Sequence, residues 1–286
     1  MLAAFDGDVH AADVFEEATR VLGYDPRSRD DARSLASTVD AQIGLVIAGV
    51  ASVRSLTKRG GTFDAVAGHS VGAFAAAVAA RAMSFADALR VVSERARIMA
   101  ELFPSGYGMG VLAGLQESAA RRVVACGGDV YVANANAPLQ FVLAGEVQAL
   151  TRALEAGARA GARRADRLDV AVPSHCALLA PVARHLESVL ADVPLRDPQG
   201  TFVGSVGARV IRDAETLRAD LAAGVAHEVR WHDATTLLAE LGATIFLEAV
   251  PGHVLTDLAA AAFPRVRAIA LEDAGAESAV ALMKRA

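Results

Sequence analysis

The sequence has few cysteines, few aromatic residues and no long uninterrupted apolar run. Its 286 residues include 2 cysteines and 1 tryptophan, and aromatic residues make up 5%. Cys126 and Cys176 cannot form a disulfide framework, and no Cys/His spacing resembles a zinc site, so we expect no metal. The longest apolar candidates end at Arg54 and Arg81, short of the roughly 18 consecutive apolar residues that a membrane span requires. We therefore expect a soluble chain that is not inserted in a membrane.

The chain also lacks an excess of basic residues. The 28 lysines and arginines are scattered and are outnumbered by 33 acidic residues, for a net charge of −5, so the charge pattern does not favour nucleic-acid binding. Acidic residues such as Asp6, Asp8 and Glu16 argue against a signal peptide, and we expect a cytoplasmic location. With 53% hydrophobic residues, the chain has enough apolar material for a large core, which excludes intrinsic disorder.

The alternation of apolar and turn-forming residues predicts an α/β fold with two parts. Residues 105–172 have the order β-α-β-β-α-β, which is typical of a ferredoxin-like subdomain. Residues 1–104 and 173–286 are then an α/β-hydrolase-like main domain built on a parallel sheet. We expect helices over residues 11–25, 37–53, 72–82, 84–102, 117–126, 147–160, 176–190, 214–224 and 231–241, and strands over 63–67, 108–115, 130–134, 140–144, 167–172, 201–205 and 245–248.

The motif Gly68-His69-Ser70-Val71-Gly72 lies between a predicted strand and an alanine-rich helix. This is the context of a nucleophile elbow, a turn so tight that the residues two before and two after the serine cannot carry bulk. The elbow exposes the hydroxyl of Ser70 beside a helix N-terminus, where the backbone N–H of Val71 can stabilise an oxyanion. The alternative is a glycine-containing turn in which the serine is incidental.

A serine nucleophile needs a base, and 7 histidines are available. His69 is adjacent in sequence, but an elbow points neighbouring side chains in different directions, so His69 is a poor base. His175 lies in Val172-Pro173-Ser174-His175-Cys176, where the predicted subdomain rejoins the main domain. This position would face a cleft between the two parts, although a helix-capping histidine is the equal alternative.

Several segments together resemble the malonyl-CoA:acyl carrier protein transacylase family over almost the whole chain. They are the elbow, Arg95-x-x-x-Met99, residues 134–138 with 144–145, residues 172–176, Val229-Arg230-Trp231, and Pro251-Gly252-x-Val254-Leu255-Thr256. Within that family, residues 104–109 and 229–234 look most like the epsilon subunit of malonate decarboxylase. Ala73 points the same way, because members that serve fatty-acid synthesis usually carry glutamate there.

The resemblance implies a role for each matching residue. Ser70 is implied as the acylated nucleophile, and His175 as its general base. A backbone carbonyl orients the histidine in this family, and by alignment it belongs to Gly224. Arg95 matches the arginine that binds the free carboxylate of a malonyl group, a task suited to a planar guanidinium. The alternative for Arg95 is an ordinary surface arginine of a helix.

Two further residues are expected in the substrate cleft. His69 and Asn134 are candidate substrate-binding residues, while Asn134 and Asn136 could instead hydrogen-bond loop backbone. Cys126 and Cys176 are interpreted as buried small hydrophobic residues.

The resemblance implies transfer of malonyl from CoA to the phosphopantetheine thiol of an acyl carrier protein through an acyl-serine. It implies no cofactor, with malonyl-CoA, a carrier protein and other malonate decarboxylase subunits as partners. The alternatives are a malonyl transacylase of fatty-acid synthesis, a serine thioesterase or esterase, and a catalytically weak scaffold subunit. A hydrolase of the α/β class would use a late histidine, for which His253 is the candidate.

The chain departs from the family at its beginning. Family members normally begin with a strand and a Phe-Pro-Gly-Gln-Gly segment whose glutamine frames the oxyanion hole, and by alignment Met1 falls just after it. Loss of one oxyanion donor typically costs on the order of 10²-fold in rate. A missing central strand would also expose the edges of its neighbours. We therefore expect weak activity or low stability from this form, corrected by an upstream in-frame extension.

Overall fold

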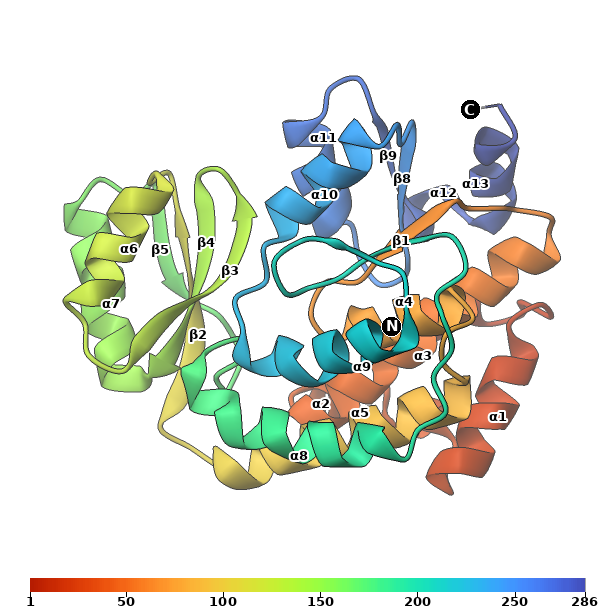
Figure 1. The fold of residues 1–286 in the computed structure, drawn as a ribbon, viewed down its shortest axis with the longest axis horizontal. Helices are drawn as coiled ribbons and strands as arrows, with labels where there is room; N and C mark the ends of the chain where they lie inside the picture. The colour runs from red at the N-terminus through yellow and green to blue at the C-terminus, as the bar shows by residue number, and fades with distance from the viewer. Residues whose placement is uncertain (286) are drawn as a thin grey trace.

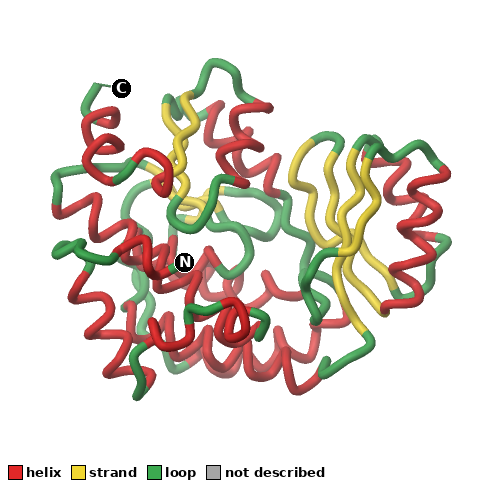
Figure 2. The backbone as a smooth tube through the Cα atoms, turned by 180° about the vertical axis from the view of Figure 1, so that it is seen from behind, coloured by secondary structure: helices red, strands yellow, loops and turns green. Residues whose placement is uncertain are grey.

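Residues 1–285 are described by a computed structural model, which has a mixed α/β architecture in two parts (Figure 1). A four-stranded antiparallel sheet with two helices lies on the left of Figure 1, and the remaining helices and short strands lie on the right. Figure 2, seen from behind, shows that both helices of the smaller part cover the face of its sheet that points away from the larger part. The other face of that sheet is turned toward the larger part.

The smaller part has the element order β-α-β-β-α-β that the sequence predicts. Its strands are arranged β3-β4-β2-β5, and each neighbouring pair is antiparallel. Apolar side chains of the sheet and both helices form a separate core that includes Leu112, Phe141 and Leu150. The elements are β2 (Tyr107–Ala113), α6 (Glu117–Ala125), β3 (Val130–Ala137), β4 (Gln140–Glu146), α7 (Val147–Arg159) and β5 (Arg164–Arg167).

The bounds of the strand expected over residues 167–172 are wrong, because the observed strand ends where the predicted one begins. The last strand of this part is β5 (Arg164–Arg167), whose residues pair with Gly110–Ala113 of β2. Residues 168–172 instead form the connection to the larger part. Val172 is buried there, but Val170, two residues earlier, is 37% exposed, so the alternating apolar residues do not share one buried face as they would in a half-buried strand.

The larger part is built around the long helix α3 (Thr38–Lys58), which packs against α4 (Gly72–Ala79) and α5 (Phe85–Leu102). The side chain of Ser37 caps α3 by accepting from the N–H of Val39. Gly49 allows α3 and α4 to approach closely, since a Cβ at this position would lie 2.8 Å from that of Ala75. Among the described residues, α3 is the one helix long and apolar enough to cross a membrane, but 67% of its most apolar window is buried inside the protein, as in a core helix.

The parallel sheet of the larger part is interrupted, whereas the sequence predicted one sheet. Strand β1 (Ala65–Ala67) pairs in parallel with β6 (Thr201–Val203), and β7 (Val210–Ile211) adds to β6 in the antiparallel sense. Strands β8 (Ile245–Glu248) and β9 (Arg267–Ala270) form a separate parallel pair.

Strands β1 and β8 nevertheless share the same covering layers. Ala65, Ala67 and Phe246 pack on one apolar cluster, and Val66 and Leu247 pack on another. In residues 1–285, β1 and β8 each have one edge without a strand partner, and both strands are only half-buried. The sheet is therefore divided between β1 and β8. The two strands are covered by common layers but do not hydrogen-bond to each other.

The other elements of the larger part surround this core. They are η1 (Leu2–Phe5), α1 (Ala12–Leu22), η2 (Pro26–Arg29), α2 (Ala32–Leu35), η3 (Ala177–Leu179), α8 (Ala180–Ala191), α9 (Ala214–Ala223), η4 (Gly224–Ala226), α10 (Trp231–Glu240), α11 (Val254–Ala262), α12 (Leu271–Ala274) and α13 (Ala276–Met283). The helix predicted over 176–190 thus begins as a 3₁₀ turn and becomes α-helical at Ala180.

The segment around Val229 joins the two parts. Its N–H donates to the carbonyl of Ala133 and its carbonyl accepts from the N–H of Ala135, both on β3. Val229 also bridges to Val206 of the larger part. Ion pairs reinforce the joint, with Arg230 lying 2.6 Å from Glu117 of α6. These contacts hold β3 against the larger part beside the end of β1.

Candidate active site

The candidate nucleophile lies in a tight turn between β1 and α4. Ser70 has a φ of +55°, in the left-handed region that L-residues rarely adopt. A Cβ on Gly68 would lie 2.2 Å from the backbone nitrogen of Ala73, so the turn requires glycine there. A Cβ on Gly72 would meet no atom within 4 Å, which makes the predicted bulk restriction wrong for this position. The difference arises because α4 begins at Gly72 and its Cβ position points away from the turn.

The side chains of Ser70 and His175 meet although they are far apart in sequence. Oγ of Ser70 lies 2.6 Å from Nε2 of His175, and Nδ1 of His175 lies 2.7 Å from the carbonyl oxygen of Gly224. Because a carbonyl only accepts, Nδ1 carries the proton and Nε2 presents a lone pair to the serine hydroxyl. The serine therefore donates its proton toward the histidine, the arrangement that a general base requires.

The backbone and surroundings of His175 favour its neutral form. The residue is 3% exposed, has a φ of +58°, and its N–H donates to the carbonyl of Val225 at 2.8 Å. Burial is the main cause that lowers the pKa of His175 to about 3, and the positive charge of Arg95 adds to the effect. At neutral pH the imidazole is thus unprotonated and able to accept a proton.

The backbone N–H of Val71 is a free donor beside the serine. Within residues 1–285 it donates to no backbone or side-chain acceptor. Val71 is the N-cap residue of α4, so this N–H belongs to the positive end of the helix. It can therefore hydrogen-bond a negative charge that develops near Oγ of Ser70.

Arg95 is not a surface arginine. It occupies the buried face of α5 with Val92 and Met99 and is 3% exposed. No carboxylate in residues 1–285 pairs with it, and its Nη1 donates to Oε1 of Gln42. Burial lowers the pKa of Arg95 to about 10.

The neighbouring arginines of α5 behave differently. Arg90 pairs with Asp87, and Arg97 pairs with Glu94 and Glu101 at the helix surface. An arginine that is buried without an acid is costly, which makes Arg95 a candidate for binding an anion that is not part of the chain.

His69 belongs to a cluster beside the serine. Its Nε2 lies 3.0 Å from Oδ1 of Asn136 and 3.0 Å from the side-chain amide of Asn134, and its ring packs edge-on against Trp231. Nε2 can donate to Oδ1 of Asn136 or accept from Nδ2 of Asn134 but cannot do both at once, and in either tautomer this nitrogen bonds an asparagine amide rather than Ser70. Burial also lowers the pKa of His69. The structure therefore places His69 and Asn134 in one hydrogen-bonded group that links β3 to the turn.

Two polar residues near the site have no counterpart in the sequence predictions. Gln42 is 7% exposed on α3, and the sequence signal was a single amide in an apolar helix. Asp220 of α9 is 2% exposed and accepts from the N–H groups of Ser205 and Val206, both at 3.0 Å. It thereby ties the loop after β6 to the helix that ends at Gly224.

A cavity of about 350 Å³ opens beside His175. Its walls come from both parts of the molecule, and the lining residues are Arg121, Val124, Ala125, Tyr131, Val132, His175, Cys176, Ala177, Ala226, His227 and Glu228. Cys176 is buried, as expected, and burial raises the pKa of its thiol to about 11. Cys126 is exposed, so its interpretation as a buried residue is wrong. It is the C-cap residue at the end of α6.

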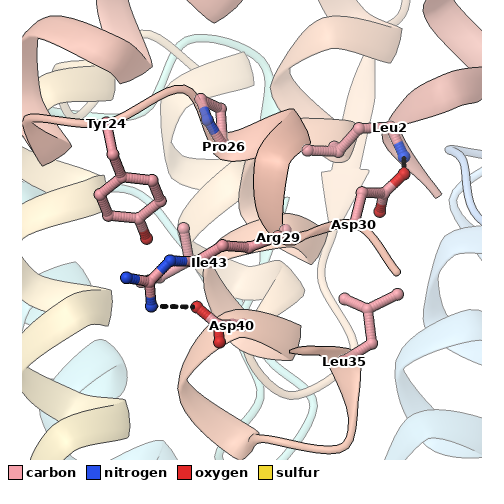
Figure 3. A pocket seen from close by; sticks show the side chains of 9 residues that line it. Leu2, Tyr24, Pro26, Arg29, Asp30, Leu35, Asp40 and Ile43 are labelled. Carbon is pink, nitrogen blue, oxygen red and sulfur yellow. Dashed lines mark hydrogen bonds and ion pairs between the residues drawn. The ribbon is translucent and has the colours of Figure 1, made fainter. Parts of the chain in front are cut away.

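A second cavity, of about 10 Å³, is lined by none of the candidate site residues, and Figure 3 shows the side chains that line it. It is enclosed by the first residues of the chain, η2 and the start of α3, where Asp30 accepts from the N–H of Leu2 and Arg29 pairs with Asp40. Its volume suits at most one water molecule, so it is not a substrate site. No group of three His, Cys, Asp or Glu residues within 1–285 is placed to hold a metal ion.

A serine hydroxyl held in a strand–helix turn and bonded to a buried neutral imidazole is the arrangement used by enzymes that act through an activated serine. Residues 9–285 match the family model described as the acyl transferase domain, and the chain belongs to this family.

Named relatives share most of the chain. The malonyl CoA-acyl carrier protein transacylase of Salmonella typhimurium is 36% identical over 93% of this chain and 89% of that protein. The corresponding Bacillus subtilis protein is 32% identical over 91% and 84%. The chain is therefore an acyltransferase by family.

Solved structures give the same result. A malonyl-transacylase in complex with a type II PKS acyl-carrier protein superposes with a TM-score of 0.93 at 35% identity, covering 100% of this chain and 95% of that one. The malonyl CoA-acyl carrier protein transacylase of Coxiella burnetii gives 0.94 at 30% identity, covering 100% and 92%.

Proposed function

We propose that the protein transfers a malonyl group from CoA to the phosphopantetheine thiol of an acyl carrier protein. The observation that carries the proposal is the 2.6 Å contact between Oγ of Ser70 and Nε2 of the buried, neutral His175. The buried Arg95, which has no acidic partner, supports a substrate with a free carboxylate. Relatives named malonyl CoA-acyl carrier protein transacylase support the same substrate pair.

The first half-reaction acylates the serine. Oγ of Ser70 attacks the thioester carbonyl of malonyl-CoA while its proton passes to Nε2 of His175. The N–H of Val71 hydrogen-bonds the oxyanion of the tetrahedral intermediate. The C–S bond then breaks, and the proton on His175 goes to the departing CoA sulfur, which leaves malonyl-Ser70 and a neutral imidazole. The hydrogen bond from Nδ1 to the Gly224 carbonyl keeps the ring oriented in both steps.

The second half-reaction repeats this chemistry in reverse with a different thiol. The carrier thiol gives its proton to His175 and attacks the ester carbonyl, and Oγ of Ser70 takes the proton back as it leaves. Malonyl transfer therefore follows a ping-pong order. Arg95 holds the malonyl carboxylate throughout, and His69 with Asn134 lines the acyl site.

The comparisons favour the transacylase type found in fatty-acid synthesis over a malonate decarboxylase subunit. The relatives reported above are named malonyl CoA-acyl carrier protein transacylase or malonyl-transacylase, and none of these names mentions malonate decarboxylase. Malonyl transfer onto purified carrier proteins of each type decides between them. Faster transfer to a carrier of fatty-acid synthesis supports this proposal, and faster transfer to a decarboxylase carrier supports the subunit assignment.

We also propose the domain division predicted from the sequence. The strand order β3-β4-β2-β5 and the two helices between 105 and 172 support a ferredoxin-like subdomain. It is inserted in an α/β-hydrolase-like main domain, residues 1–104 and 173–286, in which the strand–turn–helix around Ser70 supports that class.

Intact-mass analysis after mixing with malonyl-CoA tests the function. A malonyl adduct on the wild type that is absent from Ser70→Ala and transfers to a carrier thiol supports it. Rapid release of free malonate without a carrier would instead indicate a serine hydrolase. No adduct on the wild type at any pH between 6 and 9 would indicate a scaffold.

A further inference from the structure

We propose that Asp220 is a positioning residue: its carboxylate holds the loop that supports the turn of Ser70 against the end of the helix whose carbonyl orients His175. The inference rests on the proposed acyl transfer through Ser70. The serine and the histidine come from distant segments of the chain, and Asp220 connects the structures that support each of them.

The Asp220 carboxylate binds the loop after β6 with both of its oxygens. Oδ2 accepts from the N–H of Ser205 and Oδ1 accepts from the N–H of Val206, each at 3.0 Å. The residue is 2% exposed, so water cannot readily replace these bonds. Gly204 makes room for the carboxylate, since a Cβ at that position would lie 2.7 Å from Oδ1 of Asp220. The backbone of the loop is therefore shaped around this side chain.

The same loop supports the nucleophile turn and the joint between the two parts of the molecule. Oγ of Ser205 donates to the carbonyl of Gly68, where the turn begins, at 3.3 Å. Val206 bridges to Val229, which hydrogen-bonds to β3 on both sides. A shift of the loop would therefore move the backbone that carries Ser70 relative to β3.

Asp220 is also attached to the carbonyl that orients the histidine. It lies one turn before the end of α9, and its own carbonyl accepts from the N–H of Gly224. The carbonyl of Gly224 accepts in turn from Nδ1 of His175 at 2.7 Å. Asp220 thus holds the loop through its side chain and the orienting peptide through its backbone. Movement of either support would disturb the 2.6 Å contact between Oγ of Ser70 and Nε2 of His175.

The two donors of the loop favour a carboxylate over an amide. Both groups that face the side chain of Asp220 are backbone N–H groups, and a carboxylate accepts from both, whereas an asparagine would turn its own NH₂ toward one of them. Burial raises the pKa of Asp220, and the two N–H bonds, together with the nearby Arg209 and His227, oppose this effect. Replacement by asparagine therefore keeps the volume and removes one of the two bonds.

The test compares Asp220→Asn with the wild type in single-turnover acylation of Ser70. Quenched samples are analysed by intact mass at several concentrations of malonyl-CoA and of acetyl-CoA, which separates the saturating rate from the half-saturating concentration. Asp220→Asn should lower the saturating rate on the order of 10²-fold for both thioesters, because a misplaced nucleophile or base slows the chemical step. The half-saturating concentrations should change less than about 3-fold, since Arg95 and its donors stay in place.

Asp213→Ala is the matched control on the same helix. Asp213 is exposed and caps the other end of α9 by accepting from the N–H of Thr216 at 2.8 Å. Removal of this cap should lower the melting temperature but leave the saturating rate within about 3-fold of the wild type. A comparable loss of rate in both variants would show that Asp220 acts only through the stability of α9, which would overturn the proposal.

The outcomes separate this inference from the proposed function. If the wild type forms malonyl-Ser70 and Asp220→Asn keeps the saturating rate within about 3-fold, or raises only the half-saturating concentration, the inference alone fails. If the wild type forms no malonyl-Ser70, the proposed function fails. The burst of p-nitrophenol from p-nitrophenyl acetate then measures acylation of Ser70 in the same variants and decides the inference, which is overturned by an equal burst rate in Asp220→Asn or by no burst in the wild type.

Ser205→Ala covers the case in which Asp220→Asn does not fold. This change removes the hydrogen bond to the carbonyl of Gly68 and keeps the backbone N–H that binds Asp220. It should lower the saturating rate about 5-fold and leave the half-saturating concentration unchanged, in proportion to the loss of one hydrogen bond between neutral groups. An unchanged saturating rate would overturn the proposal.

Discussion

Replacement of Arg95 by methionine separates substrate binding from folding. Methionine keeps an unbranched apolar stem in the buried face of α5 and removes only the charge and its donors. Two hydrogen bonds from the free guanidinium edge to a carboxylate are worth about 1.5–3 kcal/mol each. Their loss predicts a decrease of roughly 10²–10⁴-fold in kcat/KM for malonyl-CoA, with acetyl-CoA changed less than about 3-fold.

The same change should not destabilise the fold. Burial lowers the pKa of Arg95 to about 10, which corresponds to about 3 kcal/mol lost by the charged form relative to water. Removal of the charge recovers this energy but leaves Oε1 of Gln42 without its donor, at about 1–3 kcal/mol. The free energy of unfolding should therefore stay equal or increase by up to about 2 kcal/mol.

The assay is a pair of steady-state titrations with the two thioesters, together with thermal unfolding of the unliganded protein. A parallel loss of malonyl and acetyl transfer, or a marked decrease in melting temperature, would show that Arg95 supports the structure and does not bind the acyl carboxylate. Arg90→Met, at the surface of the same helix, is the matched control and should leave the substrate ratio unchanged.

Three further predictions concern the turn, the base and the thiols. Gly68→Ala should abolish acylation and cost at least about 3 kcal/mol of stability, whereas Gly72→Ala should keep both, as measured by adduct formation and denaturant unfolding; equal effects would contradict the geometry of the turn. The pKa of His175 is about 3 in the folded protein and near 6.5 in the unfolded chain. The plot of kcat/KM for acylation against pH should therefore show no decrease near pH 6.5, and an acidic limb there would contradict the prediction. The free energy of unfolding should decrease as pH falls from 6.5 toward 3, because the unfolded chain binds the proton first. Iodoacetamide at pH 7.5 should modify the exposed Cys126 and spare Cys176, whose buried thiol has a raised pKa, and peptide mapping that finds Cys176 alkylated first would refute this.

The local sequence was sufficient to predict features that depend on residues close together in the chain. The strand–turn–helix around Ser70 follows from glycine and serine in a short motif between apolar segments, and Gly68 is required by its own neighbours. The strand and helix order of residues 105–172 follows from periodicity, apart from the end of the last strand. The last strand was predicted too late in the chain because residues 168–172, which connect the two parts, have the alternating apolar pattern of a strand.

The sequence by itself determined which groups are present: a serine in a turn, a histidine at a junction and an arginine in an apolar helical face. Only the tertiary structure decided which of them meet, since 105 residues separate Ser70 from His175 and 49 separate His175 from the Gly224 carbonyl. It also decided that Arg95 has an amide and not an acid as its partner, because Gln42 comes from another helix. Periodicity and propensity act over a few residues, whereas packing brings distant side chains together, and desolvation at that contact sets their charge.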